Sequence, residues 1–190
     1  MLYKYSQILF KQKNYKEAIH YLNQITVKDE RNLKALIMLG KIYFNLGNYL
    51  KAEKYFKRVL EIDESEIDSR LLLAESLFMQ EKYKEVIKLV EDLPKSKKGR
   101  NFLLFEGKSY LKIDSFEEAE NIFTALLGDG KDNPEILTEL GISLFKQNKL
   151  KKAIEVLKKS LVLTVRIKTP CFIWVFFIPK KINYLMLKLS

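Results

Sequence analysis

Apolar and polar residues alternate along this chain with the spacing of amphipathic helices, most clearly between residues 36 and 59. In the first half of that segment, apolar and small residues recur every three or four positions, at Leu36, Leu39, Gly40 and Tyr43. In the second half the same spacing returns at Ala52, Tyr55, Phe56 and Val59. The pair Gly47-Asn48 separates the two runs. The pattern predicts two helices, each with one apolar face, joined by a tight turn.

This hairpin pattern is repeated along most of the chain at an interval of 34 residues. Two aromatic columns keep the interval: Phe10, Phe44 and Phe78, and Tyr15, Tyr49 and Tyr83. One residue is then lost, and the pattern resumes at Leu111, Phe116 and Ala119 and again at Phe145, Leu150 and Ala153. A column of small residues follows the same frame: Ser6, Gly40, Ala74, Gly107 and Gly141. A fixed period of this length predicts stacked helical hairpins, whose small residues let paired helices approach closely.

Helix start and stop residues agree with this division. Asn14 and Ser115 are suited to N-cap positions, and Asn133-Pro134 combines a cap with a first-turn proline. Pro94 is expected to end the sixth helix early, which accounts for the lost residue. The basic segment 95–100 that follows is interpreted as a solvated connection rather than a phosphate-binding loop, because a phosphate site would need neighbouring aromatic residues or helix N-termini directed at a ligand.

The repeated pattern resembles that of the tetratricopeptide repeat family. The second copy carries the family's residues most completely, at Leu36, Leu39-Gly40, Tyr43, Ala52 and Phe56. The resemblance implies an all-α fold, an α-solenoid of about five helix-turn-helix repeats in a right-handed superhelix with an irregular C-terminal tail. The expected array covers residues 1–163, with repeats at about 1–32, 33–66, 67–99, 100–133 and 134–163, and the tail covers 164–190.

Composition and charge narrow the class of protein. Hydrophobic residues make up 47% of the chain and charged residues 31%, as in ordinary helix-rich globular proteins. The single cysteine, Cys171, excludes an intrachain disulfide, and the N-terminus has no signal-peptide pattern, so a cytoplasmic location is expected. The net charge is +10, but residues 165–190 contain five basic residues and no acid. The rest of the chain is therefore only mildly basic, and no nucleic-acid partner is expected.

The tail allows several interpretations. Its apolar block 171–178 lies between two prolines and is too short for a membrane span, which needs about 20 apolar residues. Contact with a membrane surface is possible but not favoured, with these aromatic and basic residues at the headgroup boundary: Phe172, Trp174, Phe176, Phe177, Lys180 and Lys181. The abrupt change in composition favours the interpretation that the coding sequence is truncated or read out of frame at this point. On this interpretation the chain is a fragment of a longer repeat protein. A short apolar segment packed on the last repeat is the remaining interpretation.

The sequence contains no pattern typical of catalysis. His20 is the only histidine, and no cluster of histidine, cysteine, aspartate and glutamate has the spacing of a metal site. Gly128-Asp129-Gly130 is interpreted as a helix stop and turn, since no glycine-rich phosphate-binding loop is present. We expect no cofactor, no metal and no enzymatic activity.

The resemblance to the family also implies where a partner binds, because the first helices of the repeats line the concave surface. The residues expected there are Ile37, Lys41, Asn45, Leu71, Glu75, Met79, Leu104, Lys108, Lys112 and Ile142. They form an apolar stripe with scattered charges, which suits an extended peptide or an amphipathic helix. The neighbouring Phe44, Phe78 and Phe145 are expected to pack between helices instead.

The predicted function is therefore a scaffold that binds a peptide or helix of a protein partner in a groove. The alternative is a membrane-surface assembly factor anchored by the tail. Some members of the family bind the C-terminal carboxylate of chaperones through lysine, asparagine and arginine residues. The equivalent positions here do not match that pattern in either of two registers, so this type of adaptor is disfavoured.

Overall fold

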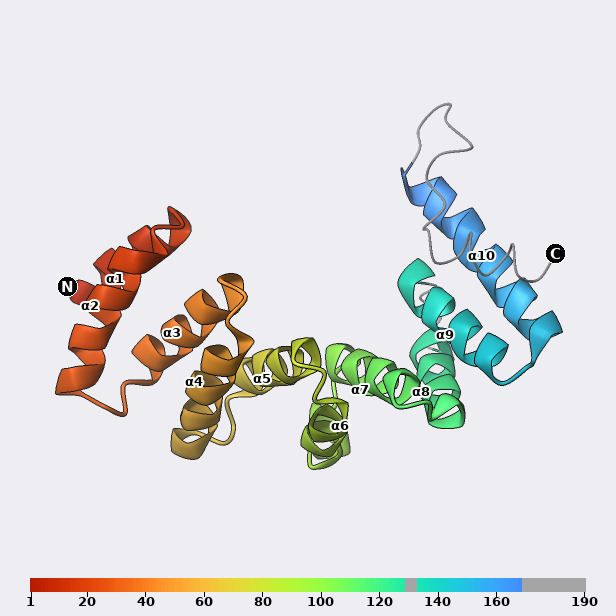
Figure 1. Ribbon diagram of the computed structural model, residues 1–190, viewed down its shortest axis with the longest axis horizontal. Helices are drawn as coiled ribbons and strands as arrows, with labels where there is room; N and C mark the ends of the chain where they lie inside the picture. The colour runs from red at the N-terminus through yellow and green to blue at the C-terminus, as the bar shows by residue number, and fades with distance from the viewer. Residues whose placement is uncertain (129–132, 169–190) are drawn as a thin grey trace. The chain divides into compact units, whose positions relative to one another are not determined.

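A computed structural model describes residues 1–128 and 133–168, and that part of the chain consists of ten α-helices and one short 3-10 helix, without strands (Figure 1). The first six helices are α1 (Leu2–Lys11), α2 (Tyr15–Lys28), α3 (Leu33–Asn45), α4 (Tyr49–Ile62), α5 (Ile67–Met79) and α6 (Tyr83–Glu91), followed by the 3-10 helix η1 (Lys95–Lys97). The remaining four are α7 (Arg100–Lys112), α8 (Phe116–Gly128), α9 (Pro134–Lys146) and α10 (Leu150–Lys168). The predicted all-α helical-repeat fold is confirmed.

The chain forms two compact units, Met1–Lys97 and Lys98–Ser190. In the first unit each helix from α1 to α6 packs against the next one along the chain, and α3 also contacts α5. In the second unit the same order holds from α7 to α10, and α7 also contacts α9. Each unit therefore brings two first helices of neighbouring repeats into contact, α3 with α5 and α7 with α9.

The close approach of paired helices depends on glycine. A Cβ atom added to Gly40 would lie 2.6 Å from the ring of Phe56, which is fully buried between α3 and α4. The second unit repeats this contact between Gly107 and Phe123, and between Gly141 and Leu157. The predicted role of the small column is thus explained by one large side chain on the second helix, 16 positions after each glycine.

Aromatic pairs fill the space beside the turns. Phe44 packs edge-on against Tyr49, and Phe78 packs against Tyr83 with the same interplanar angle of 67°. Both phenylalanines, like Phe145, are half-buried. Their packing between helices accounts for the aromatic columns of the repeat.

One turn geometry recurs in all five hairpins. The residues with positive φ angles are Lys13, Gly47, Glu81, Asp114 and Asn148, which occupy the same position of each repeat. At the second hairpin the amide of Asn48 donates to the carbonyl of Tyr43, and the amide of Gly47 donates to that of Phe44. These two bonds define the Schellman motif that ends a helix with a left-handed residue. Only the second repeat has the glycine that this conformation favours.

Exchanging glycine and side chains at this turn position should change stability in opposite directions. A left-handed φ angle destabilises the folded state by about 1–2 kcal/mol when the residue has a side chain. Glycine has the opposite disadvantage, because its greater freedom stabilises the unfolded chain by roughly 0.5–1 kcal/mol. The difference between these two contributions is the net effect of an exchange. Gly47→Ala is therefore expected to destabilise the protein by roughly 0.5–1 kcal/mol, and Glu81→Gly to stabilise it by a similar amount. Urea unfolding measures both. Because an added Cβ at Gly47 meets no atom within 4 Å, steric overlap cannot explain a loss. Shifts of the same sign would contradict the backbone explanation.

The helix boundaries agree with most of the predicted start and stop residues. Asn133 caps α9, its side chain accepting from the amide of Glu135, and Pro134 is the first residue of that helix. Asn14 lies at the N-cap of α2, but its side chain makes no capping hydrogen bond. The helix before Pro94 is short, since α6 has 9 residues and α2 and α4 have 14 each.

The last helix, α10, continues to Lys168 and so runs past residue 163, where the repeat array was expected to end. The repeat boundaries themselves stay a prediction. The predicted tail residues 169–190 lie outside the described residues, as does the membrane-contact interpretation that depends on them.

Candidate functional site

The first unit presents six of the predicted groove residues on two helices in contact. Helix α3 carries Ile37, Lys41 and Asn45, and helix α5 carries Leu71, Glu75 and Met79. We call this set the α3–α5 face. Lys41 and Asn45 are exposed, and Met79 has 49% of its surface exposed. Ile37, Leu71 and Glu75 are half-buried, so all six contribute surface that a partner could contact.

Two polar side chains of the α3–α5 face, Asn45 and Glu75, lie in different environments. The side-chain amide of Asn45 donates to the hydroxyl of Tyr15 on α2, at 3.3 Å. Burial raises the pKa of the Glu75 carboxyl above its usual value. The face thus combines accessible apolar atoms with one partly desolvated acid.

The second unit places its four predicted groove residues less uniformly. Leu104 and Lys108 on α7 are half-buried, and Lys112 is exposed. The Lys108 ammonium forms an ion pair with Glu135 at the start of α9. Ile142 has only 7% of its surface exposed and packs against Leu157. The repeat position that holds lysine or glutamate in the second, third and fourth repeats thus holds an apolar side chain here, which packs into the core and offers little surface to a partner.

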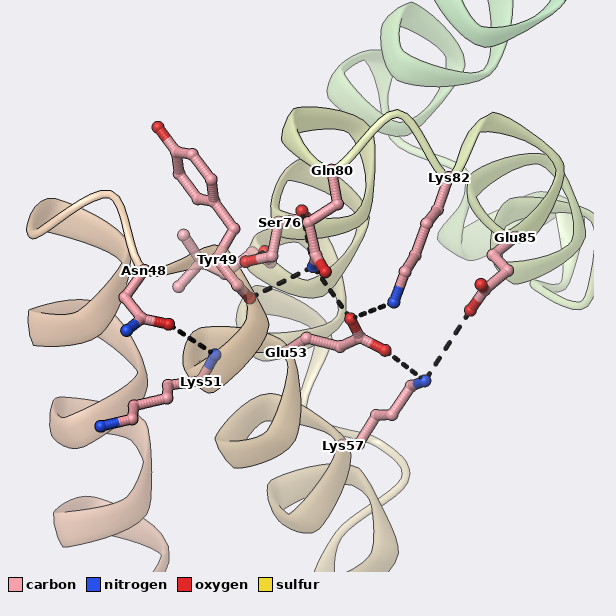
Figure 2. Close-up of polar contacts among 10 residues, drawn as sticks. Asn48, Tyr49, Lys51, Glu53, Lys57, Ser76, Gln80, Lys82 and Glu85 are labelled. Atoms are coloured by element: carbon pink, nitrogen blue, oxygen red, sulfur yellow. Dashed lines mark hydrogen bonds and ion pairs between the residues drawn. The ribbon is translucent and has the colours of Figure 1, made fainter.

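A buried polar network in the first unit was not predicted from the sequence. Figure 2 shows Glu53 of α4 at its centre, with Lys57 one turn further along α4 and with Gln80 and Lys82 reaching it from the turn after α5. Lys82 Nζ lies 2.8 Å from Glu53 Oε2, and Gln80 Nε2 lies 2.9 Å from the same oxygen. Gln80 also donates to the carbonyl of Tyr49, at 3.2 Å. We call Glu53, Gln80 and Lys82 the Glu53 clamp.

The electrostatics of the Glu53 clamp follow from burial and pairing. Only 6% of the Glu53 surface is exposed. Burial by itself would raise the pKa of Glu53, but hydrogen bonds from Lys57, Lys82 and Gln80 lower it to about 2. Glu53 is therefore an ionised residue held by three side-chain donors, and its contacts with Gln80 and Lys82 join the second repeat to the third.

The same clamp recurs in the second unit. Gln147 Nε2 donates to Glu120 Oε2 at 2.8 Å and to the carbonyl of Phe116 at 3.0 Å. Lys149 Nζ lies 2.7 Å from Glu120 Oε2. Each member follows its counterpart in the first unit by 67 residues, the length of two repeats less the lost residue. This spacing in the sequence could have revealed the clamps.

The described residues contain no group of three or more histidine, cysteine, aspartate or glutamate side chains that could hold a metal ion. His20 is exposed and shares a hydrogen bond with Gln24 on the same helix. A cavity of about 290 Å³ between α5 and η1 has Arg70 and Lys97 in its wall, but also Glu64 and Asp92. This mixture of charges does not favour a phosphate, which agrees with the interpretation of the basic connection as a solvated loop.

Within the part of the chain that the structure describes, no helix is both long and apolar enough to cross a lipid bilayer.

Comparisons with protein families match nearly the whole described chain. The family model "Anaphase-promoting complex, cyclosome, subunit 3" matches residues 1–59 and 47–126. The family model "Tetratricopeptide repeat" matches residues 106–164. No curated protein matches the chain in sequence.

Solved structures resemble the chain in fold at low sequence identity. MamA from Desulfovibrio magneticus RS-1 is 18% identical with a TM-score of 0.80, over 88% of this chain and 96% of that one. MamA from MSR-1 is 19% identical with a TM-score of 0.73, over 87% and 95% of the two chains. A tetratricopeptide repeat protein from Parabacteroides merdae is 15% identical with a TM-score of 0.72, over 99% of this chain and 69% of that one. These likenesses concern the fold.

Proposed function

Because this chain belongs to the tetratricopeptide repeat family, we propose that it is a non-catalytic scaffold that holds a peptide or helix of a protein partner against the first helices of its repeats. The cytoplasmic location expected from the sequence is part of this proposal. Family membership supports a role in protein interaction in general. The family model matched by the first 126 residues, moreover, describes a subunit of a complex.

The exposure of the α3–α5 face is the observation that carries the proposal. The core positions of the hairpins are fully buried, as Ala52 and Phe56 show. By contrast, Met79 is half-exposed, and Ile37 and Leu71 keep part of their surface open. Accessible apolar side chains at helical spacing on two adjacent helices suit an amphipathic helix or an extended peptide. In the second unit Leu104 and Lys112 offer a similar but smaller surface, since Lys108 is paired and Ile142 is buried.

Site-specific photocrosslinking in the native cell tests this function. A photoreactive amino acid replaces Lys41 or Met79 on the α3–α5 face, and in the matched control it replaces Lys54, which is exposed on the second helix α4. We expect both groove positions to form the same discrete protein adduct and the control position to form none. Equal adducts from all three positions, or none from the groove positions, would count against the proposal.

A further inference from the structure

Glu75 differs from Glu53 and Glu120, the other acids described above, because none of the described residues pairs with it. Glu53 and Glu120 each accept hydrogen bonds from a lysine and a glutamine. No hydrogen bond or ion pair reaches Glu75 from the residues that the structure describes. A carboxylate that is partly removed from water without a donor is destabilising for the free protein. A donor brought by a ligand would therefore gain more here than at an exposed acid.

The residues one turn before and one turn after Glu75 on α5 are apolar and accessible. Leu71 and Met79 lie four residues before and after it on α5, on the same side of the helix. Leu71 is half-buried and Met79 half-exposed, so both offer apolar surface beside the carboxylate. Burial is the cause of the raised pKa of Glu75, and no cation among the described residues counteracts it. This arrangement is complementary to a cation carried between two apolar side chains.

We propose that the α3–α5 face selects a segment of a partner protein in which a lysine or arginine lies between apolar residues, and that Glu75 receives the basic side chain. The inference rests on the proposed function, because it names the chemistry of the partner held on the same face. An ammonium or guanidinium group supplies the missing donors, and its charge-assisted hydrogen bonds are strong in a partly desolvated site. The flanking apolar residues of the segment cover Leu71 and Met79.

The test uses the full chain and a phage-displayed library of random peptides. Selection on the native protein is expected to enrich a lysine or arginine at one fixed position between apolar residues. One selected peptide is then synthesised, and its Kd is measured by calorimetry. Glu75→Gln is expected to raise that Kd at least about tenfold, as is replacement of the basic residue of the peptide by alanine. The control Glu61→Gln removes an exposed acid from α4 and is expected to leave the Kd unchanged.

The outcomes separate this inference from the proposed function. Two outcomes would overturn the role of Glu75 and leave the proposed groove function intact. In the first, the selected peptides lose binding to Met79→Asp but carry no basic residue. In the second, they bind Glu75→Gln as tightly as the native protein. A library that yields no peptide sensitive to Met79→Asp would overturn both. Helical circular dichroism of each variant verifies that it is folded.

Discussion

Glu53→Gln is expected to lower the free energy of unfolding at pH 7 by about 3 kcal/mol. The pKa of Glu53 falls from 4.5 to about 2 on folding, and each pKa unit corresponds to about 1.4 kcal/mol. Glutamine has nearly the same shape but no charge, so Lys57 and Lys82 lose their ionised partner. Because the carboxylate is almost fully buried, solvent screens these contacts little.

The difference in stability between the native protein and Glu53→Gln should depend on pH, and its direction follows from the lowered pKa of Glu53. A lowered pKa in the folded state stabilises the protein fully above the unfolded value of 4.5, and this stabilisation disappears as the pH falls toward 2. Urea unfolding at several pH values should therefore show a large difference between native protein and Glu53→Gln at pH 7 that shrinks below pH 4.5. A difference that stays constant across this range would mean that altered packing, not charge, is responsible. Glu120→Gln should have a smaller effect, because the Glu120 side chain is 22% exposed.

Gly40→Leu is expected to destabilise the protein by about 1–3 kcal/mol through overpacking. The first atom of the new side chain alone would lie 2.6 Å from the ring of Phe56, which is enclosed on all sides. The gain in helix propensity from replacing glycine is only about 1 kcal/mol and does not offset a side chain of four carbons at this contact. Urea or thermal unfolding measures the loss. Lys41→Leu adds the same side chain at the next, exposed position of α3 and is expected to have little effect.

The chain itself contains combinations that should rescue such a change. Where the first helix has alanine instead of glycine, at Ala74, the residue 16 positions on is Val90 instead of phenylalanine, and both are fully buried. The double variant Gly40→Ala with Phe56→Val reproduces this pair in the second repeat. We expect the double variant to lose less free energy of unfolding than the two single variants lose together, by at least about 1 kcal/mol. The reason is that the effects of substitutions at two core residues in contact are not additive. Strict additivity would show that the two positions are not in contact.

The sequence was sufficient for the fold because its information is local and repeated. Residues such as Leu36, Gly40 and Tyr43 follow the helical period, and each copy of the repeat carries the same pattern of a helical hairpin. The helix ends at these positions could also be predicted, because Pro94 and Asn133-Pro134 act on the backbone next to them. The last turns of α10 were missed because the repeat pattern stops before the helix does.

The candidate site was predicted less completely, for two physical reasons. Ile142 was assigned to the groove by its repeat position, but an apolar side chain there gains more from burial against Leu157 than from exposure. The clamps escaped notice because Glu53 and Glu120 lie 27 to 29 residues from their partners and resemble ordinary surface acids. Only a comparison of copies two repeats apart, not of adjacent copies, brings Gln80 and Gln147 into register.

The two clamps determine where the chain can be divided for expression in parts. Division after Lys97 leaves Glu53 with Gln80 and Lys82 in one piece, and Glu120 with Gln147 and Lys149 in the other. Division after Ile62, between two repeats that look equally separable in the sequence, would remove Gln80 and Lys82 and leave the Glu53 carboxylate with Lys57 alone. The smallest piece of this protein that keeps a clamp whole is thus a pair of repeats and not a single one.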